Sequence, residues 1–132
     1  MYTFIIIFIL IIILWIFLLF KFRKKKYKIS NEKIKTINTH LKRTIVNWSK
    51  KEQIIDIDKL YHKVLLEAGY EWTFWEILKS EPSEISDLNK IWELHKLRNK
   101  LVHDFDLLSE KALITKVNDY KNEISKLIKK FM

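Results

Sequence analysis

The strongest constraint on the fold is an uninterrupted apolar run, Phe4 to Phe20, near the start of the chain. No charged side chain precedes Lys21, and a helix that is apolar on every side must be surrounded by an apolar environment. About 20 such residues can cross the hydrocarbon core of a bilayer. A cleaved signal peptide would carry basic residues before the run and small residues at its end, and neither is present. We therefore predict a transmembrane anchor over residues 1–20, with a buried core helix as the alternative.

A basic tract follows the run at residues 21–29. It holds six positive side chains, namely Lys21, Arg23, Lys24, Lys25, Lys26 and Lys28. Basic residues beside a membrane helix favour the cytoplasmic side, and the same tract can bind anionic lipid headgroups. The lipid bilayer is thus the first expected partner. We predict a single-pass protein of the cell membrane with its N-terminus outside and its C-terminal domain in the cytoplasm.

The net charge of +9 gives only weak support for nucleic-acid binding. Six of the 25 Lys and Arg residues lie in the basic tract, which leaves 19 against 16 acidic residues in the rest of the chain. Such a small excess is ordinary for a soluble domain. The chain has no Cys, which excludes a disulfide framework and a thiolate metal site.

Residues 30–132 are predicted to form one all-α domain, a bundle of four to five helices. Apolar residues recur at three- and four-residue steps, which is typical of amphipathic helices, and no long strand-like alternation is present. Gly69 suits the position after a helix, and Thr73 with Glu76 fits a capping box. The expected helices run from Ser30 to about Lys51, over Ile54–Ala68, from Thr73 to before Ser80, from Ser86–Asp87 to Asp104, and from Ser109 to the C-terminus.

One segment, Trp92 to Asp104, is where ionisable residues interrupt an apolar helical face. On a helical wheel Arg98 falls near the middle of the apolar arc, and His95 and Asn99 fall inside it. An arginine on the core side is costly unless it is paired or faces a cleft. The residues that define the arc are Ile91, Leu94, Leu101 and Val102, flanked by Leu88.

Two interpretations of this segment remain open from spacing alone. In the first, Arg98 pairs with an acidic residue inside the bundle and His103 merely ends the helix. In the second, Arg98, Asn99 and His103 form a polar site that handles a phosphate. A pairing of Arg98 with Glu67, Glu76 or Asp104 would favour the first, and a basic groove beside Arg98 and His103 would favour the second.

The segment Arg98-Asn99-Lys-Leu-Val-His103 resembles the R-N-x-x-x-H signature of HEPN domains, a version of their R-x(4–6)-H motif. The longer run from Leu88 to His103 is similar to bacterial membrane-anchored proteins of this type. The resemblance covers the chain from about Asp56 to the C-terminus as a helical pattern. It implies an HEPN-like bundle, and many HEPN proteins are metal-independent ribonucleases that act as dimers, whereas others have lost activity.

The resemblance implies Arg98, Asn99 and His103 as the catalytic residues of an endoribonuclease active as a homodimer, with RNA as the substrate. Attack by the 2′-hydroxyl needs proton transfer, which His103 could supply, and stabilisation of the phosphorane, which Arg98 could supply. Asn99 could orient His103 or contact RNA. No cofactor or metal is expected, because metal-ligand spacings, a P-loop and a nucleophile elbow are absent.

The spacing of the motif limits how such a site is built. Arg98 and His103 lie about 140° apart around a straight helix and about 7.5 Å apart along its axis. A shared phosphate therefore needs the helix to unwind near His103, or a second copy of the motif from another chain. The alternatives are a non-catalytic module that binds RNA, a nucleotide or a protein, and a membrane scaffold whose only partner is another protein.

Aromatic residues cluster just before and within the motif helix. Exposed rings can stack on bases, but aromatic residues at helical spacing are more often core. We expect core positions for Tyr70, Trp72, Phe74, Trp75 and Trp92, and a solvated surface position for His62.

Overall fold

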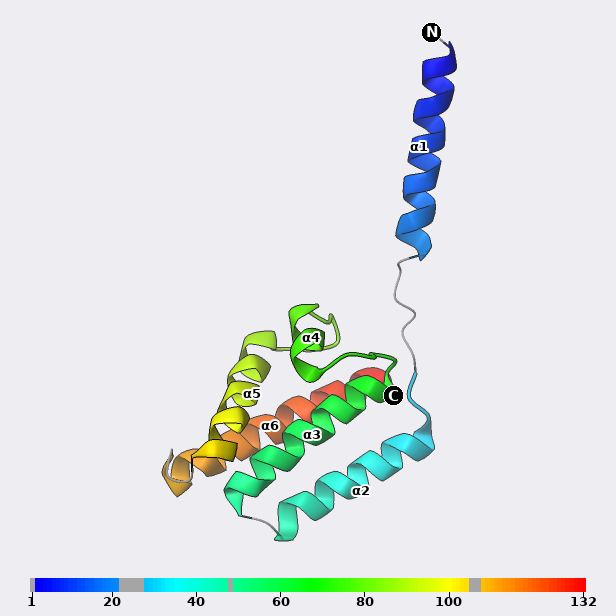
Figure 1. The fold of residues 1–132 in the computed structure, drawn as a ribbon. Coiled ribbons are helices and arrows are strands. Elements are labelled where there is room, and N and C mark those ends of the chain that lie inside the picture. Colours follow the sequence, from blue (N-terminus) through cyan, green and yellow to red (C-terminus); the bar gives the residue numbers. More distant parts are fainter. Residues whose placement is uncertain (1, 22–27, 48, 105–107) are drawn as a thin grey trace.

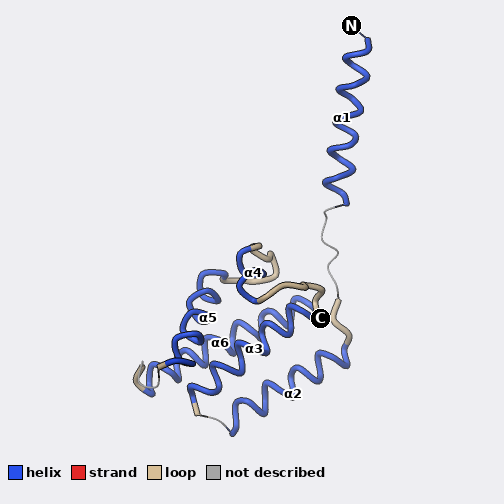
Figure 2. The backbone as a smooth tube through the Cα atoms, in the orientation of Figure 1, coloured by secondary structure: helices blue, strands red, loops and turns tan. Residues whose placement is uncertain are grey.

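The computed structural model describes residues 2–21, 28–47, 49–104 and 108–132. In these ranges the regular structure is entirely α-helical, which confirms the all-α prediction (Figures 1 and 2). The helices are α1 (Tyr2–Lys21), α2 (Asn31–Asn47), α3 (Lys50–Glu67), α4 (Phe74–Lys79), α5 (Leu88–His103) and α6 (Glu110–Phe131).

Helix α1 contains the apolar run and stands clear of the other helices (Figure 1). Its side chains are described for residues 5–16, and all of them are exposed, between 43% at Ile12 and 66% at Trp15. Within the described residues, no helix contains a stretch long and apolar enough to be assigned as a membrane span. Four of the six basic residues of the tract, at positions 23–26, lie outside the described residues.

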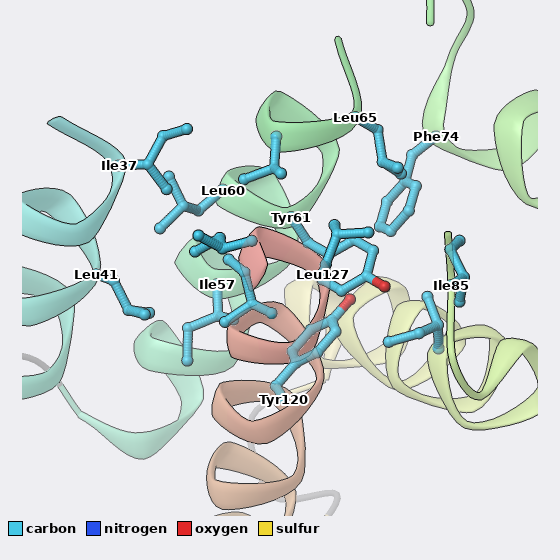
Figure 3. Packing of buried hydrophobic residues seen from close by; sticks show 14 of the residues in the cluster. Ile37, Leu41, Ile57, Leu60, Tyr61, Leu65, Phe74, Ile85, Tyr120 and Leu127 are labelled. Carbon is cyan, nitrogen blue, oxygen red and sulfur yellow. The ribbon is translucent and has the colours of Figure 1, made fainter. Parts of the chain in front are cut away.

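The remaining helices form one bundle around α3, which packs against α2, α5 and α6 (Figure 1). At its centre the rings of Tyr61 from α3 and Tyr120 from α6 stack with centroids 6.1 Å apart (Figure 3). Phe74 of α4 stacks on the other side of Tyr61 at 5.7 Å. The largest fully buried aliphatic side chains around them are Ile54, Ile57, Leu65, Ile77, Leu78, Ile91, Leu94, Leu101, Ile124 and Leu127.

The boundary between α2 and α3 differs from the predicted helix over Ser30 to Lys51. Helix α2 ends at Asn47, and α3 begins at Lys50. The physical reason is a capping box at Ser49, whose hydroxyl accepts from the backbone N–H of Glu52 while the Glu52 carboxylate accepts from the backbone N–H of Ser49. Trp48, which falls inside the predicted helix, lies outside the described residues.

The other predicted helix ends are confirmed. Thr73 closes a capping box with Glu76, and the side chains of Asp87 and Ser109 cap α5 and α6. Gly69 follows the C-cap of α3 with φ of 96°, a left-handed value that Gly adopts without a Cβ penalty. The N–H of Gly69 then donates to the Leu66 carbonyl and the N–H of Tyr70 donates to the Leu65 carbonyl, which is the Schellman arrangement.

The aromatic segment is only partly core. Phe74 is buried, and Tyr70 and Trp92 are half-buried against the core, but Trp75 is 42% exposed and Trp72 is more exposed still. The expectation of core positions is therefore wrong for these two tryptophans. Helix α4 is a single short helix, so only the side with Phe74 faces the bundle and Trp75 is left on the surface beside α5.

Candidate functional site

Three helices meet at the carboxylate of Asp58, which is 3% exposed. From α5, His95 Nδ1 lies 2.9 Å from Asp58 Oδ1, and from α6 the Tyr120 hydroxyl donates to the same oxygen at 2.5 Å. Arg98 Nε of α5 lies 3.7 Å from the other oxygen, Oδ2. Asp58 therefore ties α3 to both α5 and α6 through three polar partners, and we call these four residues with Asn99 the Asp58 network.

The hydrogen bonds of this network assign the roles of the two nitrogens of the His95 ring. A carboxylate only accepts, so His95 Nδ1 carries the proton that it donates to Asp58. In the neutral ring Nε2 is then an acceptor, and the amide nitrogen of Asn99 lies 3.5 Å from it. The Asn99 amide oxygen accepts from Arg98 Nη1 at 2.8 Å. The chain Asp58–His95–Asn99–Arg98 thus closes back on Asp58 through the ion pair.

Tyr120 is the fully buried member of the network. Burial, followed by the nearby Asp58 carboxylate, raises the pKa of the Tyr120 hydroxyl well above its ordinary value. Tyr120 therefore stays protonated at neutral pH and acts as a permanent donor to Asp58. A charged carboxylate inside a bundle needs such donors, because an unpaired buried charge is costly.

Arg98 is paired, as the first interpretation of the motif expected, but with Asp58 and not with any of the three acids named from the sequence. Of those, Glu67 binds Lys33 on α2, and Glu76 caps α4 at Thr73. The Arg98 side chain keeps 27% of its surface exposed. Its Nε is buried and makes no hydrogen bond within the described part of the chain, so the contact with Asp58 is electrostatic.

His103 lies apart from the Asp58 network. It is the last residue of α5 and is exposed, and among the described residues it makes no hydrogen bond or ion pair. Asn99, which was expected to orient His103 or contact RNA, hydrogen-bonds Arg98 and lies beside the ring of His95. The apolar arc also ends sooner than expected, since Val102 is 44% exposed.

Helix α5 stays regular up to His103, and the Asp104 N–H still donates to the Lys100 carbonyl at 2.9 Å. Local unwinding, one of the two routes to a composite site, is therefore not found here. Within one chain the motif separates into Arg98 with Asn99, held by the network, and His103 at the helix end. A site that uses both needs a second copy of the motif.

The sequence interpretation missed Asp58 and the polar role of Tyr120. A usable signal was present, because Asp58 lies four residues after Ile54 and three before Tyr61, inside the apolar stripe of α3. A carboxylate in such a stripe predicts buried partners. His95 did fall inside the apolar arc, and a histidine at such a position can hydrogen-bond a buried acid on a facing helix.

His62 also differs from its expected solvated position. It is half-buried, its ring stacks on Phe74 with centroids 5.4 Å apart, and its Nε2 lies 3.0 Å from the Trp72 carbonyl oxygen. His62 therefore packs the segment before α4 onto α3. Within the described residues no group of His, Asp and Glu side chains is arranged to hold a metal ion.

Comparison with family models, curated proteins and solved structures gives no match to this chain. The resemblance to HEPN domains thus rests on the residues of the motif and on the helical pattern around it.

Proposed function

We propose that this chain is a membrane-anchored, HEPN-like, metal-independent endoribonuclease that acts as a homodimer. The observation that carries the proposal is the position of Arg98. Its guanidinium is paired with buried Asp58 and donates a hydrogen bond to Asn99, while part of its side chain remains exposed. An arginine restrained in this way loses little conformational entropy when its free N–H groups bind a phosphate.

In the proposed reaction the 2′-hydroxyl of RNA attacks the adjacent phosphate. The exposed imidazole of His103 takes the hydroxyl proton or returns one to the leaving 5′-oxygen. The guanidinium of Arg98 stabilises the negative charge of the phosphorane. Asn99 positions Arg98, and His95 with Asp58 supports Asn99 from the core side.

The regular geometry of α5 supports a dimeric site. Because Arg98 and His103 lie about 140° apart on one helix, each phosphate would contact Arg98 of one chain and His103 of the other. A twofold axis between two α5 helices produces two such pairs. The homodimer is thus part of the proposed mechanism.

The anchor proposal rests on the apolar run and the basic tract. In α1 the described apolar side chains are all exposed, so the bundle provides no core for them. We propose that α1 crosses the cell membrane with the N-terminus outside and residues 30–132 in the cytoplasm. A reporter fused after Met132 is expected to be active in the cytoplasm, and protection of that reporter from external protease tests the orientation. Cleavage of the reporter from outside the cell would contradict it.

The alternative function is a non-catalytic HEPN-like module at the membrane that binds RNA, a nucleotide or a protein. The ion pair between Arg98 and Asp58 favours this alternative, because it gives the motif arginine a structural role in joining α5 to α3. Under this reading Arg98 substitution lowers stability, while His103 substitution changes nothing.

An RNA-cleavage assay on the full chain in detergent micelles separates the two functions. His103→Ala should abolish cleavage of a labelled RNA in the presence of a chelator, while its melting temperature and dimer remain unchanged. His40→Ala is the matched control, because His40 is likewise exposed on a helix and is far from the motif in sequence. If the wild-type dimer cleaves no RNA, the nuclease proposal is overturned and the non-catalytic binding module remains as the function.

Mixing two inactive variants tests whether the site is shared between chains. Arg98→Gln and His103→Ala chains are each expected to be inactive alone. In a heterodimer of the two, one composite site combines Arg98 of the His103→Ala chain with His103 of the Arg98→Gln chain. Random mixing then restores about a quarter of the wild-type activity, because half of the dimers carry one intact site of two. No restoration in a confirmed heterodimer would place both residues in a single-chain site.

A further inference from the structure

One exposed face of α5 carries four residues, of which only Trp92 packs partly against the apolar core. Trp92, Lys96, Asn99 and His103 are spaced four, three and four residues apart, so they fall within about 60° of one another around the helix. Lys96, Asn99 and His103 are exposed and Trp92 is half-buried. This face, called the α5 face below, is about 16 Å long.

At its first end the α5 face meets the surface side of α4. The rings of Trp75 and Trp92 contact edge to face with centroids 4.5 Å apart. Lys79 Nζ lies 5.4 Å from the Trp75 ring, and Lys96 Nζ lies 5.8 Å from the Trp92 ring. Each of these two rings is therefore accompanied by a lysine ammonium group.

The charges on this surface favour an anionic partner. None of the four residues of the α5 face is acidic. Two exposed carboxylates lie near this surface in the sequence, namely Glu93 on α5 and Glu76 on α4, and Glu76 is engaged in the capping box with Thr73. Trp75 exposes 42% of its surface to solvent, although burial of such a ring would stabilise the fold. Aromatic rings that can stack on bases, together with cations that can contact phosphates, are the two components of a single-strand binding surface.

We propose that the α4–α5 surface binds single-stranded RNA, with bases on Trp75 and Trp92 and phosphates on Lys79 and Lys96, and leads the strand along α5 to His103. The inference rests on the proposed function, because it names the substrate class and the approach to the same motif. It differs from that function in assigning recognition to residues outside Arg98 and His103. Preference for a single strand follows from the need for an unpaired base face.

The test is a fluorescence-anisotropy titration of the full chain in nanodiscs of neutral lipid. The probe is a short fluorescein-labelled oligouridylate whose 2′-hydroxyls are methylated, so that it cannot be cleaved and binding is measured independently of catalysis. Trp75→Ala is the primary variant, because the exposed ring can be removed with the fold retained. Trp72→Ala is its matched control, since Trp72 is an exposed tryptophan of the preceding loop.

The expected result is a weakening of binding by about 5- to 150-fold in Trp75→Ala, the range for loss of stacking on one base, and no change in Trp72→Ala. Lys96→Gln should reduce the slope of log affinity against log salt by about 0.7, the value for one phosphate contact with a single strand. A duplex of the same sequence should bind more weakly than the single strand.

Equal affinity of wild type and Trp75→Ala, or an equal loss in Trp72→Ala, would overturn the assignment. The assignment would also be overturned if the wild-type chain bound no oligonucleotide and the Trp75→Ala substitution dissociated the dimer. That result would assign this surface to a second copy of the chain. Cleavage is scored separately. If Trp75→Ala loses probe binding while the wild type cleaves no RNA, the binding surface is supported and the nuclease proposal is not. If the wild type cleaves RNA while Trp75→Ala binds the probe as tightly as wild type, the nuclease proposal is supported and the binding surface is not.

Discussion

Asp58 Oδ2 lies 3.7 Å from Nε of Arg98, which joins the motif arginine on α5 to a buried carboxylate on α3. The other oxygen of the same carboxylate holds His95 and Tyr120. Asp58 thus joins three polar side chains inside the bundle, and it lies on the helix that contacts α2, α5 and α6.

Asp58→Ala is expected to lower the free energy of unfolding by about 3–5 kcal/mol, the cost of breaking a buried charge network from one side. It leaves His95 and Tyr120 without their acceptor and Arg98 without its counter-ion. Asp56→Ala is the control, because Asp56 lies two residues earlier on α3, about 160° away around the helix. Asp56 makes only a 3.5 Å surface ion pair with Lys59, so its removal should cost less than about 1 kcal/mol. Urea denaturation followed by circular dichroism measures both, and similar losses would contradict the role of Asp58.

Tyr120→Phe tests the alkaline limit of stability. The raised pKa of Tyr120 means that the folded chain keeps its phenolic proton above pH 10, whereas the unfolded chain releases it there. The contribution of Tyr120 is therefore fully present below about pH 10 and is lost as the pH rises beyond that value. The variant should show a shallower fall of unfolding free energy above about pH 10 in urea titrations. Parallel falls in variant and wild type would show that Tyr120 does not contribute.

At neutral pH the same variant removes one hydrogen bond to a charged group. A loss of about 1.5–3 kcal/mol is expected, because Asp58 Oδ1 then keeps only His95 as its donor. The thermal midpoint should fall accordingly.

Trp92→Ala and Trp75→Ala are expected to differ in stability, although the two rings touch. Trp92 packs half-buried against the core, so its truncation should cost about 2 kcal/mol, roughly half the loss for a fully buried tryptophan. Trp75 is exposed and should cost less than about 1 kcal/mol. Thermal unfolding of the two variants provides the measurement. A larger loss from Trp75 would mean that its ring carries the packing between α4 and α5.

Gly69→Ala should destabilise the end of α3 by about 1–2 kcal/mol, because a Cβ atom disfavours the left-handed backbone at φ of 96°. Ala68→Ser at the preceding position, where the backbone has φ of −81°, controls for substitution at the helix end. A neutral Gly69→Ala, measured by urea denaturation, would show that the turn can relax into another conformation.

The sequence by itself predicted the all-α class, the cap residues Thr73, Asp87 and Ser109, and the turn at Gly69. These features depend on local chemistry, since a cap or an apolar stripe is complete within a few residues. The same local reasoning missed the start of α3: Ser49, placed inside the preceding predicted helix, forms a capping box with Glu52. It left open whether Arg98 would be paired inside the bundle or would face a cleft.

The identity of the Arg98 partner was decided only by the tertiary structure. Asp58, His95 and Tyr120 lie on three helices that are far apart in sequence, and their contacts exist because α5 and α6 pack on the same side of α3. Likewise, the exposure of Trp75 depends on which side of the short helix α4 faces the bundle. Periodicity shows that a side chain lies on a face of a helix, but packing between helices determines what that face meets.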